Sequence, residues 1–556
     1  MPPKAGFLVE IQNASLSIGN APILKNISLH INNEEIVALV GESGSGKSIS
    51  ALTLLGLQPQ SAMIHAEELH FNGIHLLSLK SEDWERIRGK EIGMVFQEPQ
   101  SSLNPSMRCG AQLMEVLKKH TLLTHNEREE KMEMLLHEVQ LHDTKRIIKS
   151  YPHELSGGQK QRIMIAMALL CEPKLLIADE PTTALDVTVQ KEIILLLRSL
   201  QLKYQMSILF ISHDLALVKQ LANRVYVMYK GEIVESGKVK TLFQKPQHPY
   251  TAGLLAARPK TAVRFERLPT LSDFEKGAVS KKNITPEHRA EAHRKLYNKT
   301  PLLEVKGLEK NYEKRHWFAP NESFNAVRKI DFVLYPGEVL GLVGESGCGK
   351  SSLAKALVFL DPPTKGEVIY KGRCIQPHDA EQIRQLRKEI QFIFQDPYSA
   401  LHPLKTIGNT IEEVIRVHHS SIKLLSRKNS AFELLQQVGL DTAFYTRYPH
   451  ELSGGQRQRV VIARALATEP QVLICDESVA ALDISIQAQV LNLLNDLKKK
   501  FGLSFLFISH DLAVVKYMSD RVMVMEQGQM VEIQEADRLY ASPKHPYTKK
   551  LIQAIL

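Results

Sequence analysis

A twelve-residue stretch occurs twice in this chain and constrains its fold more than any other feature. Residues 151–162 read YPHELSGGQKQR, and residues 448–459 read YPHELSGGQRQR, 297 positions later. Stacked repeats recur every 20 to 50 residues or so, so this spacing indicates a duplicated domain. In a chain of 556 residues it predicts two domains, at residues 6–258 and 301–556, joined by a basic linker at residues 259–300.

Charge, cysteine content and hydropathy exclude several classes of protein. The formal charge is +9, but residues 260–300 hold ten Lys or Arg against five Asp or Glu, so the two domains are only mildly basic. Without a basic stripe carrying exposed aromatics, we expect no nucleic-acid partner. The five cysteines show no C-x-x-C pair or zinc spacing and indicate reduced, cytosolic thiols. No signal-peptide core and no run of 18 apolar residues occur, so we expect a chain that neither spans nor crosses a membrane.

The first half carries a complete phosphate-binding motif. The apolar run at residues 35–40 predicts a buried strand, and GESGSGKS follows it directly, before a helical pattern. The backbone N–H groups of such a loop wrap phosphates, its lysine reaches the β- and γ-phosphates, and its serine binds Mg²⁺. A Gly-rich turn is the structural alternative. The predicted ATP-binding residues are Gly41, Glu42, Ser43, Gly44, Ser45, Gly46, Lys47 and Ser48.

Further polar residues follow the predicted strands of the first half. The strand KLLIADE ends in Asp179, a predicted Mg²⁺ ligand, and Glu180, which would orient or deprotonate the attacking water. SILFI precedes His213, which we expect at the same sheet edge and near the γ-phosphate, because parallel sheets gather ligands at their carboxyl ends. Gln97 can touch Mg²⁺ and the water through its amide. The structural alternatives are a capped strand end before Pro181 and a surface histidine.

The second half repeats the set. The predicted phosphate loop consists of Gly344, Glu345, Ser346, Gly347, Cys348, Gly349, Lys350 and Ser351. The counterparts of the other site residues are Gln395, Asp476, Glu477 and His510. The predicted catalytic residues are therefore Gln97, Glu180, His213, Gln395, Glu477 and His510. The predicted Mg²⁺ ligands are Ser48, Gln97, Asp179, Ser351, Gln395 and Asp476.

Two regions outside the site also carry patterns. Residues 107–150 are amphipathic and predict a helical insert between the glutamine and the repeated stretch. Within the linker, Thr285 and Pro286 predict the N-cap and first residue of a short helix. As a flexible coil of about 42 residues, the linker would reach roughly 36 Å, enough for one half to face the other.

These motifs, in this order and twice, resemble the nucleotide-binding domains of ABC transporters, and LSGGQ is that family's own signature. FQEPQSSLNP, FQDPYSALHP and the segments at residues 248–251 and 545–548, both HPYT, look like those of dipeptide, oligopeptide and nickel importers. The first half resembles the D-type subunit and the second the F-type subunit. The resemblance implies an α/β fold with two P-loop NTPase domains. Each would have a mostly parallel sheet, an N-terminal antiparallel β subdomain and an α-helical insert.

The resemblance also implies an ATPase that works as a pair of halves facing head to tail. The signature Ser453-Gly454-Gly455 would complete the ATP site of the first phosphate loop, and Ser156-Gly157-Gly158 that of the second. Hydrolysis would then move the helical inserts and, through them, two transmembrane permease subunits that receive substrate from a binding protein. The implied location is the cytoplasmic face of the bacterial inner membrane. The transported substrate stays open among dipeptides, oligopeptides, glutathione, peptide antibiotics and nickel.

The chain departs from the family pattern at three points. An aromatic residue stacks on adenine in this family; Tyr312 fits that place in the second half, whereas Ile18 holds it in the first. The second half reads CDESVAALD where the family favours a proline and then a small hydroxyl after the glutamate; Asp483 is retained, which predicts a working site with altered coupling. Without a late cysteine cluster, we expect no iron–sulfur cluster.

Soluble tandem ABC proteins are the rival class. Ribosome-acting factors of the ABC-F type have a longer, strongly charged helical linker and lack the QEPxxSLNP and HPYT features. Excision-repair ATPases need zinc-binding cysteines, and iron–sulfur ribosome-recycling ATPases need a cysteine-rich start; neither set is present.

Overall fold

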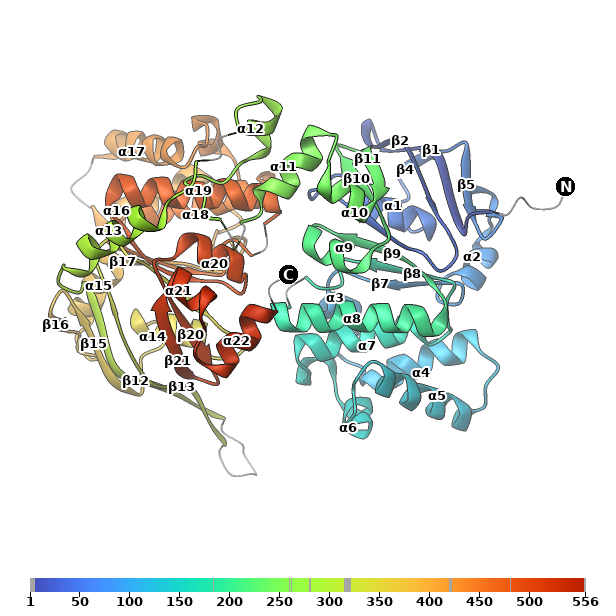
Figure 1. Cartoon of the computed structure of the whole chain (residues 1–556), viewed down its shortest axis with the longest axis horizontal. Helices are drawn as coiled ribbons and strands as arrows, with labels where there is room; N and C mark the ends of the chain where they lie inside the picture. The colour runs from blue at the N-terminus through green and yellow to red at the C-terminus, as the bar shows by residue number, and fades with distance from the viewer. Residues whose placement is uncertain are drawn as a thin grey trace. The chain divides into compact units, whose positions relative to one another are not determined.

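The structure is a computed structural model that describes residues 6–183, 185–259, 261, 263–279, 282–314, 322–419, 423–480 and 482–554. The chain divides into two compact units, one up to Leu255 and one from Ala256. Each unit is built from its own antiparallel sheet, central sheet and set of helices, so the duplication seen in the sequence is also a duplication of structure (Figure 1).

The central sheet of the first unit has the strand order β11-β10-β3-β9-β8-β7. All neighbours pair in parallel except β11, which runs antiparallel to β10. Strands β3 and β8 are buried along their whole length, as expected for apolar runs covered on both faces. The strands are β3 (Ile36–Val40), β7 (Ile92–Val95), β8 (Leu175–Asp179), β9 (Ser207–Ser212), β10 (Arg224–Tyr229) and β11 (Glu232–Lys238).

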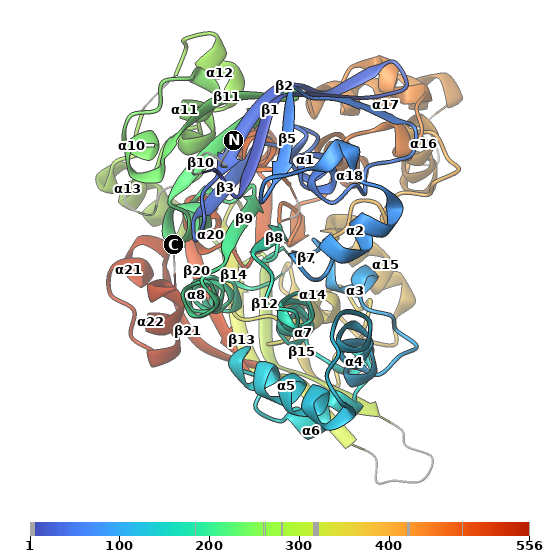
Figure 2. The ribbon, with the colours of Figure 1, turned by 90° about the vertical axis from the view of Figure 1, so that its right-hand side faces the viewer.

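A separate antiparallel sheet carries the amino-terminal part of this unit, in the order β2-β1-β5-β6 with β4 also paired to β1. Its strands are β1 (Val9–Ile18), β2 (Ala21–Ile31), β4 (Ala62–His65), β5 (Glu68–Phe71) and β6 (Ile74–His75). The helical insert lies at the opposite end of the unit from this sheet, below it in Figures 1 and 2. The insert comprises α4 (Cys109–His120), α5 (His125–Glu138) and α6 (Thr144–Lys149), as the amphipathic pattern predicted.

The remaining helices of the first unit lie between its strands or, for the last two, after its final strand. They are α1 (Lys47–Leu54), α2 (Ser81–Ile87), α3 (Pro99–Ser102), α7 (Gly157–Leu169), α8 (Val187–Tyr204), α9 (Leu215–Leu221), α10 (Val239–Gln244) and α11 (Pro249–Ala257). Two of them begin within motifs of the sequence, since α1 starts at the lysine of the phosphate loop and α7 at the first glycine of LSGGQ.

The second unit repeats this plan with the central order β17-β18-β19-β14-β20-β21 and an antiparallel sheet β13-β12-β15-β16. The central strands are β14 (Val339–Val343), β17 (Ile390–Ile393), β18 (Val472–Asp476), β19 (Ser504–Ile508), β20 (Arg521–Glu526) and β21 (Gln529–Glu535). The other sheet consists of β12 (Leu303–Lys314), β13 (Glu322–Leu334), β15 (Lys365–Tyr370) and β16 (Arg373–Cys374). The predicted α/β class and layout are thus observed in both halves.

The helices of the second unit fall into three groups. Those between or after the central strands are α14 (Lys350–Leu357), α15 (Ala380–Glu389), α18 (Gly454–Leu466), α19 (Ile484–Phe501), α20 (Leu512–Met518), α21 (Ala536–Ala541) and α22 (Pro546–Gln553). The insert helices are α16 (Ile407–His418) and α17 (Leu424–Gln437). Two more, α12 (Leu271–Glu275) and α13 (Pro286–Tyr297), come before the first strand of the unit.

The segment with α12 and α13 packs against the second unit over its described residues, so it is not a free coil there. We name residues 263–300 the connecting arm. As predicted, its helix α13 starts at Pro286 with Thr285 as N-cap, which accepts a hydrogen bond from His288 N–H at 3.3 Å. The side chain of Asn492 on α19 pairs with both the N–H and the C=O of Leu268, at 2.9 and 2.8 Å. Leu268 is fully buried.

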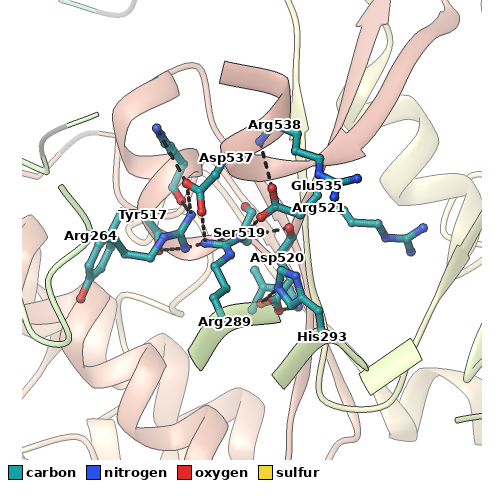
Figure 3. Close-up of polar contacts among 12 residues, drawn as sticks. Arg264, Arg289, His293, Tyr517, Ser519, Asp520, Arg521, Glu535, Asp537 and Arg538 are labelled. Atoms are coloured by element: carbon teal, nitrogen blue, oxygen red, sulfur yellow. Dashed lines mark hydrogen bonds and ion pairs between the residues drawn. The ribbon is translucent and has the colours of Figure 1, made fainter. Parts of the chain in front are cut away.

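Two buried arginines fasten the arm to the end of helix α20 (Figure 3). Arg264 donates to the carbonyls of Tyr517 and Ser519 at 2.9 and 3.2 Å. Arg289 donates to the carbonyl of Ser519 at 2.9 Å and pairs with Glu535 at 2.8 Å. The C-terminal end of a helix presents unpaired carbonyls and partial negative charge, so it is a favourable place for two guanidinium groups.

Asp520 joins the arm to the central sheet. Its carboxylate accepts a hydrogen bond from the Val339 N–H at 2.9 Å. The same carboxylate lies 3.1 Å from Lys498 Nζ and 3.3 Å from Nε2 of His293 in the arm. Burial acts to raise the pKa of Asp520, but the charge of Lys498 and the bonds from His293 and Val339 outweigh it, so the pKa lies well below its usual value. The first unit has the neutral counterpart Asn223, which accepts the Ile36 N–H at 3.0 Å.

Within the part of the chain that the structure describes, no helix combines the length and the apolar character needed to cross a membrane.

We expect Asp520→Asn to lower the free energy of unfolding of the second unit by about 2 kcal/mol, because the amide keeps the bond to Val339 but leaves Lys498 and His293 without their carboxylate. Because the folded pKa is depressed, the difference from wild type is fully present above pH about 4 and is lost as the pH falls further. Denaturant titrations of both proteins at several pH values measure this difference in the free energy of unfolding.

The matched control is Asp496→Asn. Asp496 pairs with Arg267 of the arm at 3.0 Å, but both side chains are exposed, so its loss should change the free energy of unfolding by less than about 1 kcal/mol. Equal effects of the two variants would contradict a special role for Asp520.

Candidate functional site

The two phosphate loops turn at glycines with the same backbone conformation. Gly46 and Gly349, each directly before its helix, have φ of 105°, where a side chain is strained. A Cβ atom on Gly46 would lie 2.6 Å from Leu24, and one on Gly349 would lie 2.1 Å from the carbonyl oxygen of Ala326. Each loop therefore needs glycine where it turns from its central strand, β3 or β14, into α1 or α14.

The lysine and serine of each loop lie as the motif predicts. Lys47 is buried and its Nζ donates to the carbonyl oxygens of Gly41 and Glu42 at 2.9 and 2.8 Å. Ser48 Oγ donates to Asp179 Oδ1 at 3.2 Å, so a hydroxyl and a carboxylate from α1 and β8 converge. Such hard oxygens suit Mg²⁺, and these residues therefore fit the predicted ion.

In the first site, three polar side chains converge on the carboxylate of Glu180. Its Oε2 accepts hydrogen bonds from Gln97 Nε2 and Thr183 Oγ1, each at 3.0 Å, and lies 3.0 Å from His213 Nδ1. The residue has φ of 45°, uncommon for a residue with a side chain, and its N–H donates to Ile211 of β9. The structure thus brings Gln97, Glu180 and His213 together, as predicted.

The second unit builds the same site with its own residues. Lys350 donates to the carbonyls of Gly344 and Glu345 at 2.8 and 2.9 Å, and Ser351 Oγ to Asp476 Oδ1 at 3.2 Å. Glu477, with φ of 48°, accepts from Gln395 at 2.8 Å and lies 3.5 Å from His510 Nδ1. All the second-half residues predicted around Glu477 therefore converge.

One donor distinguishes the two glutamates. Thr183, three residues after Glu180, has Ala480 as its counterpart three residues after Glu477. The Thr183 hydroxyl that donates to Glu180 therefore has no equivalent at Glu477. The sequence already showed the loss of a small hydroxyl, but not that this hydroxyl contacts the proposed base.

Burial and pairing separate the pKa values of the two neighbouring acids in each site. Burial raises the pKa of Asp179 and of Asp476 above the ordinary value. Burial acts in the same direction on Glu180 and Glu477, but the hydrogen bond and charge of His213 or His510 outweigh it, and their pKa values are lowered. The glutamates are therefore carboxylates at neutral pH, the form needed to accept a proton from water.

The signature serines begin helices. Ser156 caps α7: its hydroxyl accepts from Gln159 N–H at 3.3 Å, and its N–H donates to the Gln159 side chain at 3.1 Å. Ser453 caps α18 in the same way. Gly157 and Gly158, like Gly454 and Gly455, form the first helical residues. A Cβ on Gly455 would meet Ile486 at 2.3 Å, so α18 and α19 approach closely there.

The predicted adenine-stacking positions differ between the units. Tyr312 on β12 is partly exposed, and its hydroxyl donates to Asp361 at 2.5 Å. Lys310 pairs with the same carboxylate and lies 5.1 Å from the centre of the Tyr312 ring. Ile18 is the last residue of β1 and offers no aromatic face.

Sequence reasoning missed two tyrosines that touch the phosphate loops. Tyr250 Oη accepts a hydrogen bond from Glu42 N–H at 3.0 Å, and Tyr547 Oη from Glu345 N–H at 2.9 Å. Both belong to the HPYT segments, and their recurrence in the two halves was the signal that could have pointed to them.

Two family models match the chain. The model described as ABC transporter matches residues 24–183 and 327–480, and the model described as Oligopeptide/dipeptide transporter, C-terminal region, matches residues 234–278 and 531–556. The chain is 44% identical to the glutathione import ATP-binding protein GsiA of Salmonella choleraesuis (strain SC-B67), over 96% of this chain and 86% of that protein. It is 42% identical to the protein of the same name from Escherichia coli (strain K12), over 99% and 90%.

Proposed function

The chain belongs to the ABC transporter family of ATP-binding proteins, and on that premise we propose that it hydrolyses ATP to energise an importer of peptides or related small substrates. The observation that carries the proposal is the similarity along nearly the whole chain to glutathione import ATP-binding proteins. The family that the motifs predicted is confirmed by these matches, and the ATP-binding role with it.

The geometry supports two catalytic centres of the same chemistry. We assign the phosphates to the loops Gly41–Ser48 and Gly344–Ser351. Glu180 and Glu477 would each orient the attacking water and accept its proton, while His213 and His510 would contact the γ-phosphate. Mg²⁺ would be held by Ser48, Gln97 and Asp179 in one centre and by Ser351, Gln395 and Asp476 in the other, and would neutralise phosphate charge.

Each centre is proposed to be completed by the signature of the other half. A serine hydroxyl and free N–H groups at a helix start form an anion site, and Ser156 and Ser453 hold that position on α7 and α18. Since each unit already has its own phosphate loop, we pair Ser453-Gly454-Gly455 with Lys47 and Ser156-Gly157-Gly158 with Lys350. ATP then holds the halves together, and hydrolysis releases them.

The implied partners are two transmembrane permease subunits and, through them, a substrate-binding protein, at the cytoplasmic face of the inner membrane. The helical inserts, α4–α6 and α16–α17, are the proposed contact with the permeases. The names of the relatives make glutathione, itself a tripeptide, the first substrate to test, ahead of other short peptides.

Transport is tested by reconstituting the chain in proteoliposomes with the permeases encoded beside it. We expect ATPase activity and uptake to rise when the binding protein carries glutathione or a short peptide. Failure of the purified chain to bind any such permease would contradict the transport proposal.

We expect Glu180→Gln together with Glu477→Gln to lower ATP turnover by about 10²- to 10⁴-fold, because a neutral amide cannot accept the proton of the attacking water. ATP should still bind and hold the halves closed. Turnover is measured by phosphate release and ATP binding by equilibrium titration. Unchanged turnover would contradict the assignment of Glu180 and Glu477 as the bases.

The threonine beside Glu180 gives a second prediction. In the Glu477→Gln background, Thr183→Ala should lower the single-turnover rate of ATP cleavage by about fivefold with the dissociation constant of ATP unchanged, because one hydrogen bond that orients the Glu180 carboxylate is lost. Ala480→Thr in the Glu180→Gln background is the reciprocal variant and should not lower the single-turnover rate. A change in the dissociation constant alone after Thr183→Ala would show that the hydroxyl acts on nucleotide binding instead.

A further inference from the structure

The HPYT segments contact the phosphate loops in both units with the same atoms. Tyr250 on α11 and Tyr547 on α22 are almost fully buried. Their hydroxyl oxygens accept the N–H of the second loop residue, Glu42 at 3.0 Å and Glu345 at 2.9 Å. The contact occurs twice in segments 297 residues apart, so it is a feature of the duplicated domain and not of one packing arrangement.

The same loop residue is held from its other side by the phosphate-loop lysine. The carbonyl oxygen of Glu42 accepts from Lys47 Nζ at 2.8 Å, and that of Glu345 from Lys350 Nζ at 2.9 Å. One residue therefore connects the tyrosine hydroxyl to the lysine assigned to the phosphates. A shift of this residue moves the lysine with it.

The histidine and the proline of each HPYT segment hold its tyrosine in place. A glutamate on the last central strand, Glu235 or Glu532, accepts the N–H of His248 at 3.1 Å or of His545 at 3.0 Å. The histidine Nδ1 in turn accepts the N–H of the tyrosine, at 3.2 Å for Tyr250 and 3.3 Å for Tyr547. The proline that follows the histidine suits the first position of a helix.

We propose that Tyr250 and Tyr547 are positioning residues of the two ATP sites, which set the phosphate loop and its lysine through the N–H of Glu42 and Glu345. The proposal rests on the proposed function and deepens it. It gives the oligopeptide/dipeptide C-terminal region, which contains both tyrosines, a role in nucleotide binding that acts through the phosphate loop. The carboxyl-terminal helix of each cassette thereby becomes part of its phosphate site.

The test is ATP affinity in full-length protein that carries Tyr250→Phe, Tyr547→Phe or both, each in the Glu180→Gln and Glu477→Gln background so that ATP is not consumed. Phenylalanine keeps the ring and its packing and removes only the oxygen. We expect the dissociation constant of ATP, measured by calorimetric titration, to rise about tenfold at the altered site, because the part-buried loop N–H loses the hydroxyl oxygen that holds it. Each single variant should therefore weaken one of the two sites, and the double variant should weaken both.

Tyr226→Phe is the matched control. Tyr226 is buried in the first unit and its hydroxyl also accepts a backbone N–H, that of His30 at 3.2 Å, but on β2 instead of the phosphate loop. We expect it to lower the melting temperature as much as Tyr250→Phe does while leaving ATP affinity within twofold of the parent.

Dissociation constants within twofold of the parent for both Tyr250→Phe and Tyr547→Phe would overturn the proposal, as would an equal loss of affinity in Tyr226→Phe. Failure of the parent protein to bind ATP would instead contradict the proposed function. Melting temperatures of all variants are recorded in the same buffer, so a loss of folded protein is distinguished from a loss of affinity.

Discussion

The parallel pairing of three central strands is the constraint on which each site depends. In the first unit, Val40 at the end of β3 pairs with Ser212, and Asp179 at the end of β8 pairs with Ile211. The phosphate loop, the acidic pair and His213 therefore leave the sheet at one level. A slip of one residue in any strand would turn alternate side chains to the other face and separate Glu180 from its donors. The second unit keeps the same register between β14, β18 and β19.

Most of this arrangement could be predicted from the sequence, because the chemistry of the site is local to short motifs. The acids, histidines and glutamines stand at or just after strand ends that apolar runs identify, and the phosphate-loop lysines and serines begin the helices after the glycine-rich loops. The recurrence of HPYT marks Tyr250 as part of a repeated segment, but the one hydrogen bond that makes Tyr250 important, like that of Thr183, is seen only in the structure. A motif gives the residue types at a site, whereas the donor of a single bond depends on side-chain placement.

The linker shows a different limit of sequence reasoning. The sequence marks it as a basic linker, whose reach was calculated as that of a flexible coil, yet Arg264 and Arg289 are largely buried against helix carbonyls and acids of the second unit. Arg267, three residues from Arg264, is exposed. The amino-acid composition does not tell a buried arginine from an exposed one. The difference depends on the residues that each arginine contacts, which come more than 200 positions later in the chain.

The position of the arm in the chain has a consequence for synthesis. Arg289 leaves the ribosome well before Glu535 and Asp537, its partners about 250 residues later. At roughly 5 to 20 residues per second, the arm waits about 12 to 50 s for the surface that buries it. During that interval the first unit can fold, while Leu268 and the two arginines remain without their native contacts. The arm therefore completes its packing only at the end of translation, when the last strand and helices of the second unit have been synthesised.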